Sequence, residues 1–173
     1  MNTGLLILRV VLGLLLAGHG SQKLFGWMGG PGLSGTAQMF ESLGFRPGRA
    51  AAWAGGLAEF VGGLALALGW FTPFAAAMIV GMMGNAITAV HWPNGIWAQS
   101  GGIEFPLTNA AAALAVAFIG PGRFSVDHGL GWHLYGWKWG VVALVIGAVG
   151  VLAGMATRAS AARTGSGRTQ PTA

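Results

Sequence analysis

The chain has 173 residues, of which 54% are hydrophobic and only 8% are charged. Because a soluble domain carries about a quarter of its residues as charges, this composition, with a mean hydropathy of +0.64, excludes an ordinary soluble protein and indicates a membrane protein. The net charge of +5 does not indicate nucleic-acid binding, since the basic residues stand in loops and beside apolar runs long enough to cross a bilayer. The lack of cysteine excludes disulfides, thiol chemistry and iron–sulfur clusters, so a redox role would need a bound cofactor or a partner.

The first apolar segment predicts a transmembrane helix from Gly4 to Lys23, close to the roughly 20 residues that a bilayer requires. We expect it to be retained, because no basic region precedes it and no small-residue cleavage site follows it. Arg9 stands near its N-terminal end, where the side chain is expected to snorkel to the membrane surface. Pairing with an acid inside the bundle is the alternative.

The other end of this helix carries several polar residues. His19, Gln22 and Lys23 lie three and four residues apart and so share one helix face. That face predicts the wall of a polar pocket, or else a helix end at the membrane interface with Lys23 reaching the phosphates. The chain then becomes rich in Gly, Pro and Ser from Gly26 to Pro47, and Thr36 to Leu43 predicts a short amphipathic helix along the membrane surface.

A second helix is predicted from Ala50 to Trp70, with Glu59 near its middle. An ionised carboxylate at that depth costs about 2.5–3.5 kcal/mol on insertion scales, so Glu59 should be protonated, paired or turned toward a wet cavity. Glycines flank it on both sides, which lets another helix approach closely and places this face inside the bundle. A functional acid is the favoured interpretation, and a neutral carboxyl bonded to a neighbouring helix is the alternative.

The segment after this helix predicts a tight turn, with Thr72 as a cap and Pro73 opening a third helix from Phe74 to His91. Small and polar residues at spacings of three and four, among them Asn85, form a stripe expected to face inward. A fourth helix, from Pro106 to Ile119, is short for a span. Glu104 directly precedes it, and either contributes to a site or simply occupies the favourable negative position at a helix N-terminus.

The C-terminal part predicts a fifth helix and a tail. Tyr135 to Thr157 is apolar enough for a further transmembrane helix, and its Gly150 and Gly154 would permit a homo-oligomer. The residues from Arg158 to Ala173 are rich in Arg, Ser, Thr and Gly and predict a disordered basic tail. The expected organisation is all-α: a four-helix membrane bundle over 1–134 with a surface segment at 27–49, an added helix at 135–157 and a tail at 158–173.

Alternate membrane crossings would bring the polar residues to one face, with Glu59 about 13 Å below it at 1.5 Å per residue. We expect Glu59, His19 and Lys23 to be catalytic residues. Gln22, Asn85, His91 and Glu104 are expected to bind a cofactor, and no metal site is expected. The same face carries most of the basic residues, so the positive-inside rule places it, together with the C-terminus, on the cytoplasmic side of the plasma membrane.

Five motifs follow in order along the chain: Gly18-His19-Gly20-Ser21-Gln22-Lys23-Leu24-Phe25-Gly26, Gly30-Pro31-Gly32, Glu59 followed by Gly62-Gly63, Gly102-Ile103-Glu104-Phe105-Pro106, and Gly120-Pro121-Gly122-Arg123-Phe124-Ser125-Val126-Asp127. In these motifs the chain resembles the DoxX family of small membrane proteins, from about Leu5 to Asp127. The resemblance implies a four-helix membrane bundle, linked in some members to quinone-dependent thiosulfate oxidation or to a membrane complex that handles oxidative stress. The fifth helix departs from that pattern.

Three functions remain open from the sequence. In the first, the chain is a quinone-interacting subunit of an oxidoreductase: Glu59 relays a proton, His19 and Lys23 hydrogen-bond a quinone carbonyl, and a partner or the substrate supplies electrons. In the second, it is a non-catalytic membrane scaffold for soluble redox partners. In the third, it is a small-solute carrier, although it lacks the repeats that transporters often show. Haem between His19 and His91 is not expected, because histidines in membrane proteins are more often hydrogen-bonded than ligating.

Overall fold

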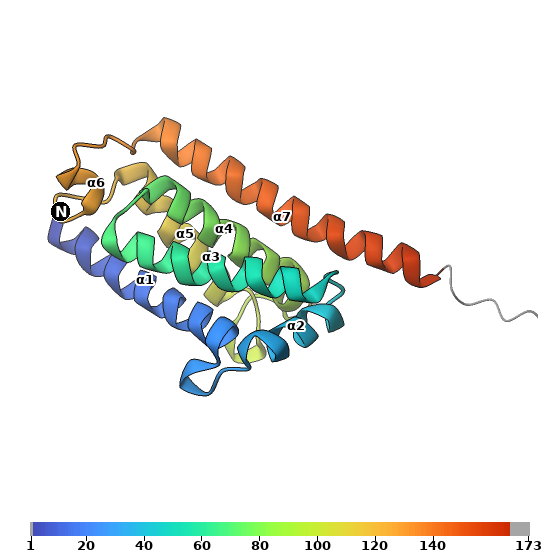
Figure 1. The fold of residues 1–173 in the computed structure, drawn as a ribbon. Helices are drawn as coiled ribbons and strands as arrows, with labels where there is room; N and C mark the ends of the chain where they lie inside the picture. The colour runs from blue at the N-terminus through green and yellow to red at the C-terminus, as the bar shows by residue number, and fades with distance from the viewer. Residues whose placement is uncertain (1, 167–173) are drawn as a thin grey trace, which may run out of the picture.

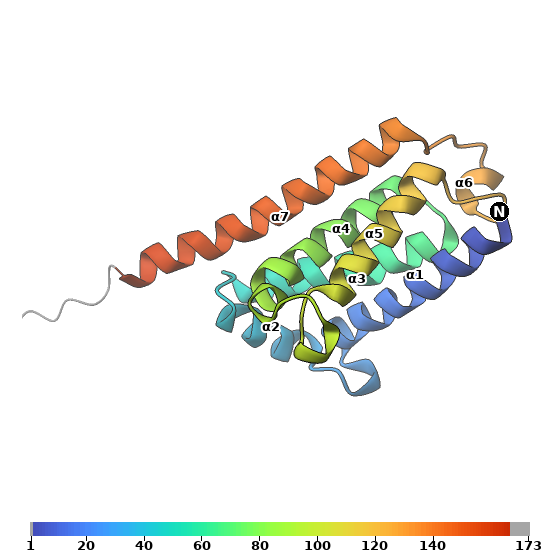
Figure 2. The same cartoon turned by 180° about the vertical axis from the view of Figure 1, so that it is seen from behind.

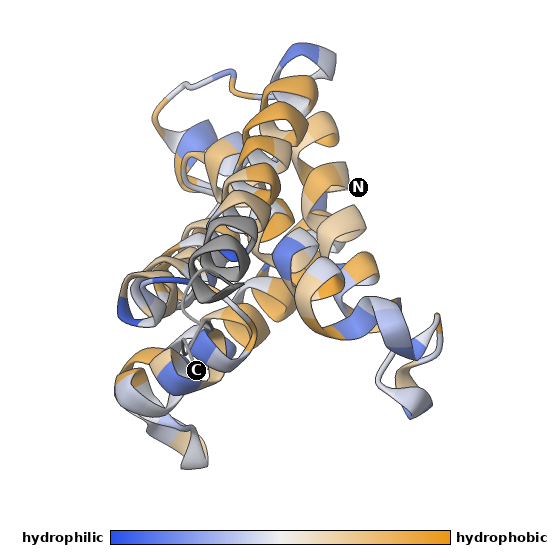
Figure 3. Cartoon of the chain, turned by 90° about the vertical axis from the view of Figure 1, so that its right-hand side faces the viewer, coloured by the Kyte–Doolittle hydropathy of each residue, from blue (hydrophilic) through white to orange (hydrophobic). Residues whose placement is uncertain are grey.

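The computed structural model describes residues 2–166, with side chains as far as Arg158. Every regular element in this part of the chain is a helix, and the long helices run roughly alongside one another (Figure 1). Figure 3 shows that hydrophobic residues dominate these helices and that hydrophilic residues gather mainly in the segments between them. The fold class predicted from the sequence, an all-α membrane bundle, is confirmed.

The bundle is built from five long helices and two short ones, joined by turns of 3-10 helix and one π-helical turn from Ile87 to His91. The helices are α1 (Asn2–Phe25), α2 (Gly32–Ser42), α3 (Gly48–Leu68), α4 (Thr72–Ala86), α5 (Glu104–Ile119), α6 (Val126–Gly129) and α7 (Trp137–Ser166).

The helix α4 lies at the centre of the arrangement. It packs against α3, α5 and α7, while α1 packs mainly against α3. In Figure 1 α3 lies in front of α4, and from behind, in Figure 2, α5 lies in front of it. The short helix α2 covers one end of the bundle, where α1, α4 and α7 have their C-termini and α3 and α5 have their N-termini (Figure 1). The helix α6 lies at the opposite end, beside the N-terminus of the chain.

Within the described residues, four helical segments are long and apolar enough to cross a membrane. They are Asn2–Phe25, Gly48–Leu68, Thr72–Asn94 and Trp137–Arg158. The helix α5 has 16 residues and is shorter than these, as the sequence indicates. At 1.5 Å per residue it extends about 24 Å, against about 30 Å of hydrocarbon.

Glycines bring α1 and α3 into backbone contact. A Cβ atom built on Gly63 would lie 2.5 Å from the carbonyl oxygen of Gly13, and Gly20 is equally close to the backbone of Phe60. Small residues at a helix crossing allow this approach, which larger side chains would prevent. The close contact fixes the register of α1 against α3 and thereby decides which polar residues of the two helices meet.

The seam between α4 and α7 is also formed by small residues. Gly150 faces the Cα of Gly81, and Gly154 lies against the side chain of Asn85. The Asn85 amide donates hydrogen bonds to the carbonyl oxygens of Gly81, at 3.0 Å, and of Gly150, at 3.1 Å. Both glycines through which the sequence permits a homo-oligomer thus pack against α4 of the same chain.

Asp127 organises the end of the bundle beside α6. Its carboxylate accepts hydrogen bonds from the N–H groups of Phe71 and Thr72 and from the Thr72 hydroxyl, at 2.7–3.0 Å. The prediction that Thr72 caps α4 is therefore wrong, because the free N–H groups at the start of α4 are satisfied by a carboxylate from a distant segment. A negative charge is favourable at this helix end.

Arg9 does not snorkel to the membrane surface, so the expectation from the sequence is wrong. Its side chain is 1% exposed, and its guanidinium donates a 2.5 Å hydrogen bond to the carbonyl oxygen of Ala67. Gly69 lies against the guanidinium, and its carbonyl oxygen accepts the N–H of Asp127, whose charge opposes that of Arg9. The buried guanidinium is stabilised by the Ala67 carbonyl oxygen at the C-terminus of α3 and by the opposite charge of Asp127.

The last helix continues beyond Thr157, where the sequence predicts a disordered tail. The structure has helix as far as Ser166. The remaining part of the predicted tail, residues 167–173, lies outside the described residues.

Candidate functional site

A buried ion pair joins α1 to α3. Lys23 Nζ lies 2.5 Å from Glu59 Oε1 and donates a hydrogen bond to it. The Glu59 side chain is 4% exposed and that of Lys23 is 19% exposed. Glu59 lies eleven residues beyond the start of α3 at Gly48, which places it about 16 Å along the helix. The sequence predicts an acid inside the bundle, and the structure shows this acid as a carboxylate paired with the ammonium of Lys23.

The ion pair leaves some hydrogen-bond donors and acceptors of Lys23 and Glu59 unused. The other carboxylate oxygen of Glu59, Oε2, is buried and has no hydrogen-bond partner among the described side chains. An ammonium has three donors, and one of those of Lys23 is used on Glu59. Two donors and one acceptor therefore remain at a site where unmade hydrogen bonds are costly.

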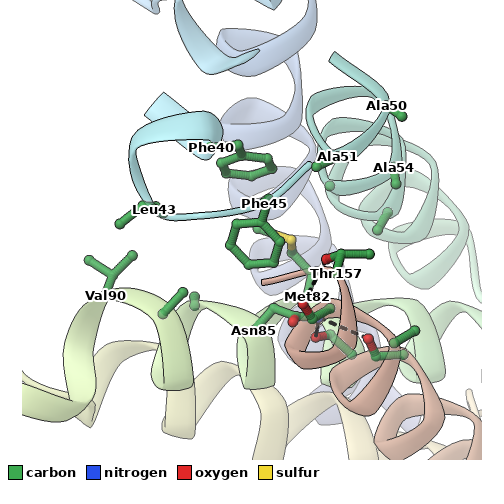
Figure 4. A pocket seen from close by; sticks show the side chains of 18 of the residues that line it. Phe40, Leu43, Phe45, Ala50, Ala51, Ala54, Met82, Asn85, Val90 and Thr157 are labelled. Atoms are coloured by element: carbon green, nitrogen blue, oxygen red, sulfur yellow. Dashed lines mark hydrogen bonds between the residues drawn. The ribbon is translucent and has the colours of Figure 1, made fainter. Parts of the chain in front are cut away.

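A cavity of about 730 Å³ opens beside this pair. We call it the inter-helix cavity. One wall is formed by α2 and α3 and the other by α4 and α7, and Figure 4 shows the side chains of both walls turned toward it. Its lining is mostly alanine, glycine and larger apolar residues, and it includes Lys23, Phe40, Leu43, Phe45, Arg46, Ala54, Ala58, Met78, Met82, Asn85, His91, Ile146, Ala153 and Thr157.

The polar groups are distributed unevenly along the cavity. Lys23 lies on the inner part of the wall, near Ala58, which precedes Glu59 in α3; Arg46 and His91 lie at the end covered by α2. Along α4 the lining extends from Ala77 to His91, about 21 Å at 1.5 Å per residue. The cavity is therefore an elongated apolar space with a cation on its inner wall and two basic residues at its outer end.

The hydrogen bond of His91 defines which of its ring nitrogens carries a proton. Nδ1 lies 2.6 Å from the carbonyl oxygen of Gly101. Because a carbonyl oxygen only accepts, Nδ1 must be the donor, so Nε2 of the neutral ring carries a lone pair. His91 can thus accept a hydrogen bond from a ligand at the outer end of the cavity.

Arg158 closes this end of the wall. Its guanidinium donates hydrogen bonds to the carbonyl oxygens of Leu43, at 3.0 Å, and Thr88, at 3.2 Å, and lies 5.5 Å from the ring centre of Phe45. One side chain of α7 is thereby bonded both to the end of α2 and to the π-helical turn of α4. The sequence predicts Arg158 as part of the tail and gives no sign of these contacts or of the contribution of α7 to the cavity.

Three of the candidate residues are not brought into the cavity. His19 is exposed, and its ring packs edge-on against Phe105 at 5.9 Å. Gln22 packs against the backbone of Gly30. Glu104 is exposed and accepts a hydrogen bond from the N–H of Ala98, which holds the loop before α5. The structure thus groups Lys23, Asn85 and His91 around one space, with Glu59 joined to it through Lys23, and leaves His19, Gln22 and Glu104 outside it.

The two histidines that haem ligation would need have separate surroundings, since His19 contacts Phe105 and His91 lines the inter-helix cavity. The described part of the chain contains no group of three or more His, Asp or Glu side chains arranged to hold a metal ion. The chemistry that these residues can perform is hydrogen bonding to a ligand and transfer of a proton through the Lys23–Glu59 pair.

The fold and the site define a multi-pass helical membrane protein with a cavity between its helices. The family model for DoxX matches residues 4–92, just over half of the chain, and the chain belongs to the DoxX family. The match includes Lys23, Glu59, Asn85 and His91, whereas α5 and α7 lie beyond it. No curated protein and no solved structure matches the chain.

Proposed function

We propose that this DoxX protein binds a membrane quinone in the inter-helix cavity and is the membrane subunit of an oxidoreductase. The observation that carries the proposal is the buried Lys23–Glu59 pair beside an apolar cavity of about 730 Å³. Ligand sites are largely apolar spaces of about 300–1,000 Å³ with a few placed polar groups, and this cavity meets both conditions. Soluble redox partners, which the chain would serve at the membrane, are part of the same proposal.

The residues present fit a quinone on two observations. The ring has two carbonyl acceptors, and Lys23 has two donors that the ion pair does not use. The apolar lining, including Phe40, Phe45 and Met82, suits an uncharged ring and would reject a free ion. When bound, a quinone supplies two-electron redox chemistry that requires protons.

The role of this chain would be to hold the ring and move protons. Lys23 orients one carbonyl oxygen by donating to it from Nζ. Glu59, bonded to Lys23 on the other side as a carboxylate, keeps the ammonium charged; a proton that Lys23 gives up would be replaced from water at the outer end of the cavity. His91, with Nε2 free to accept, would exchange protons at the outer end of the cavity.

Equilibrium titration of the purified protein in lipid nanodiscs with a benzoquinone tests the proposal. Lys23→Met should weaken binding about tenfold or more, because the donor to the ring is lost. Glu59→Gln should retain much of the binding and reduce proton uptake on quinone reduction. His19→Ala separates two expectations. If His19 binds the quinone, as the sequence predicts, the affinity falls. If only residues at the cavity bind it, the affinity is unchanged. If the wild type binds no quinone, the proposal is wrong and a non-catalytic scaffold or a carrier is left.

The orientation proposed from the sequence belongs to the same model. Apart from the buried Arg9 and the paired Lys23, the described basic side chains at the end covered by α2 are Arg46, Arg49 and Arg158, against Arg123 and Lys138 at the other end. The positive-inside rule then places the α2 end and the C-terminus in the cytoplasm, with the protein in the plasma membrane. A reporter enzyme active only outside the cytoplasm, fused after Ala173, should be inactive; an active fusion would reverse the orientation.

A further inference from the structure

We infer that the gap between α3 and α7 is a second subsite, which takes the apolar isoprenoid tail of the quinone whose ring lies at Lys23. This inference rests on the proposed function and extends it from the ring to the rest of the ligand. It gives α7, which lies outside the family match, a part in ligand selection.

The first observation is that cavity-lining residues reach the outer surface on both helices. Ala50 and Ala54 of α3, and Ile146 and Ala153 of α7, line the cavity and are also exposed. Both helices are long and apolar enough to span a membrane. The surface onto which the cavity opens is therefore one that lipid chains would cover, and a ligand dissolved in the bilayer can pass from there into the cavity.

The second observation is the size of the side chains along this gap. The lipid-facing surface of α3 elsewhere carries Trp53 and Leu57, and that of α7 carries Val149 and Leu152. Toward the gap α3 presents alanines at positions 50, 54 and 58, and α7 presents Gly150, Ala153 and Gly154 beyond the larger Ile146. Small residues on both sides leave room for a chain of methylene and methyl groups.

The third observation is that the two parts of the cavity differ in polarity, which indicates the kind of molecule that fills them. The gap is continuous with the space beside Lys23, whose ammonium binds a group with acceptors. Between α3 and α7 the lining side chains are alkyl groups, apart from Thr157 at the outer end. One molecule that satisfies both parts has a hydrogen-bond-accepting ring and a long apolar chain, which is the structure of a membrane quinone. Its ring would lie inward and its tail would extend through the gap to the lipid.

The test compares two quinones with the same ring, one without a tail and one with an isoprenoid tail. Ala153→Trp fills the gap from α7 and should weaken binding of the tailed quinone about tenfold or more, because the indole would occupy the space of the tail. Binding of the tail-less quinone should stay within about twofold. Ala148→Trp is the matched control on the same helix, because Ala148 is exposed and lines a different groove, with Val80 and Leu152; it should change neither affinity.

A second pair of variants keeps the test valid if Ala153→Trp does not fold. Ala54→Trp fills the gap from α3, and Leu57→Trp is its control on the lipid-facing surface. Equal weakening of both quinones, or no weakening of the tailed one, would overturn the tail subsite and leave the ring site standing. If neither quinone binds to the wild-type protein, the ring site and the tail subsite are both wrong.

Discussion

Removal of Lys23 should destabilise the protein through the carboxylate that it leaves behind. In Lys23→Met the side chain keeps nearly its length, but Glu59 loses its hydrogen-bond donor while it stays buried with a second oxygen already unpartnered. Removing one partner of a buried pair costs about 3–5 kcal/mol, because a charge is left without compensation. The 19% exposure of Lys23 places the expected loss at the lower end, about 3 kcal/mol.

The charge and the packing can be separated with two further variants. Glu59→Gln leaves an ammonium that can still reach water, so it should cost less, about 1–2 kcal/mol. The double variant removes both charges and should be nearly as stable as the wild type, because replacement of a whole buried pair is often neutral. The expected coupling energy between the two sites is therefore about 4–5 kcal/mol, the sum of the two single losses.

Reversible unfolding in mixed detergent and dodecyl sulfate micelles measures these free energies. If the two single losses add up to the loss in the double variant, Lys23 and Glu59 do not interact as described and the reasoning about the site fails.

Three other changes test the framework around the cavity. Arg158→Ala should cost about 2 kcal/mol of stability, because two hydrogen bonds to carbonyl oxygens are lost. Arg158→Lys should cost less, because an ammonium replaces part of these contacts. Equal stability of the wild type and Arg158→Ala in the same unfolding assay would contradict the contact. Gly63→Ala should cost about 2–3 kcal/mol, because its Cβ would lie 2.5 Å from a backbone oxygen. Gly150→Ala should change stability little, because its Cβ would lie 3.6 Å from the nearest atom. Thermal unfolding of the two variants should show this difference. Asp127→Asn should cost about 1–3 kcal/mol by placing an amide donor against backbone donors, and unchanged hydrogen exchange at the start of α4 would argue against the cap.

The helices could be predicted from the sequence because apolar runs of membrane length, bounded by Gly and Pro, leave little choice of structure. The burial of Glu59 followed from the same reasoning, since its flanking glycines indicate a packed face. Its pairing with Lys23 depends on the backbone contact of Gly13 with Gly63, which sets the register of two helices far apart in sequence. Helical spacing alone does not contain that information.

The errors at the two ends of the bundle have a similar origin. Arg9 was placed by its distance from the membrane surface, but a carbonyl of α3 and the charge of Asp127 stabilise it inside. Arg158 was assigned to a tail because it follows the last apolar run, whereas it bonds to the segment after α2 and to the π-helical turn of α4. His19 shares a helix face with Lys23 but packs against Phe105 of α5 and does not line the cavity. In each case the deciding partner comes from another helix.

Photo-crosslinking with an azido-quinone that carries an isoprenoid tail tests the central claim most directly. After irradiation of the protein in nanodiscs, mass spectrometry of the digested chain locates the labelled residues. The account predicts label on cavity-lining segments of α3, α4 and α7 near Lys23, and loss of that label in Lys23→Met. Label confined to the outer surfaces of the helices, or unchanged in Lys23→Met, would contradict it.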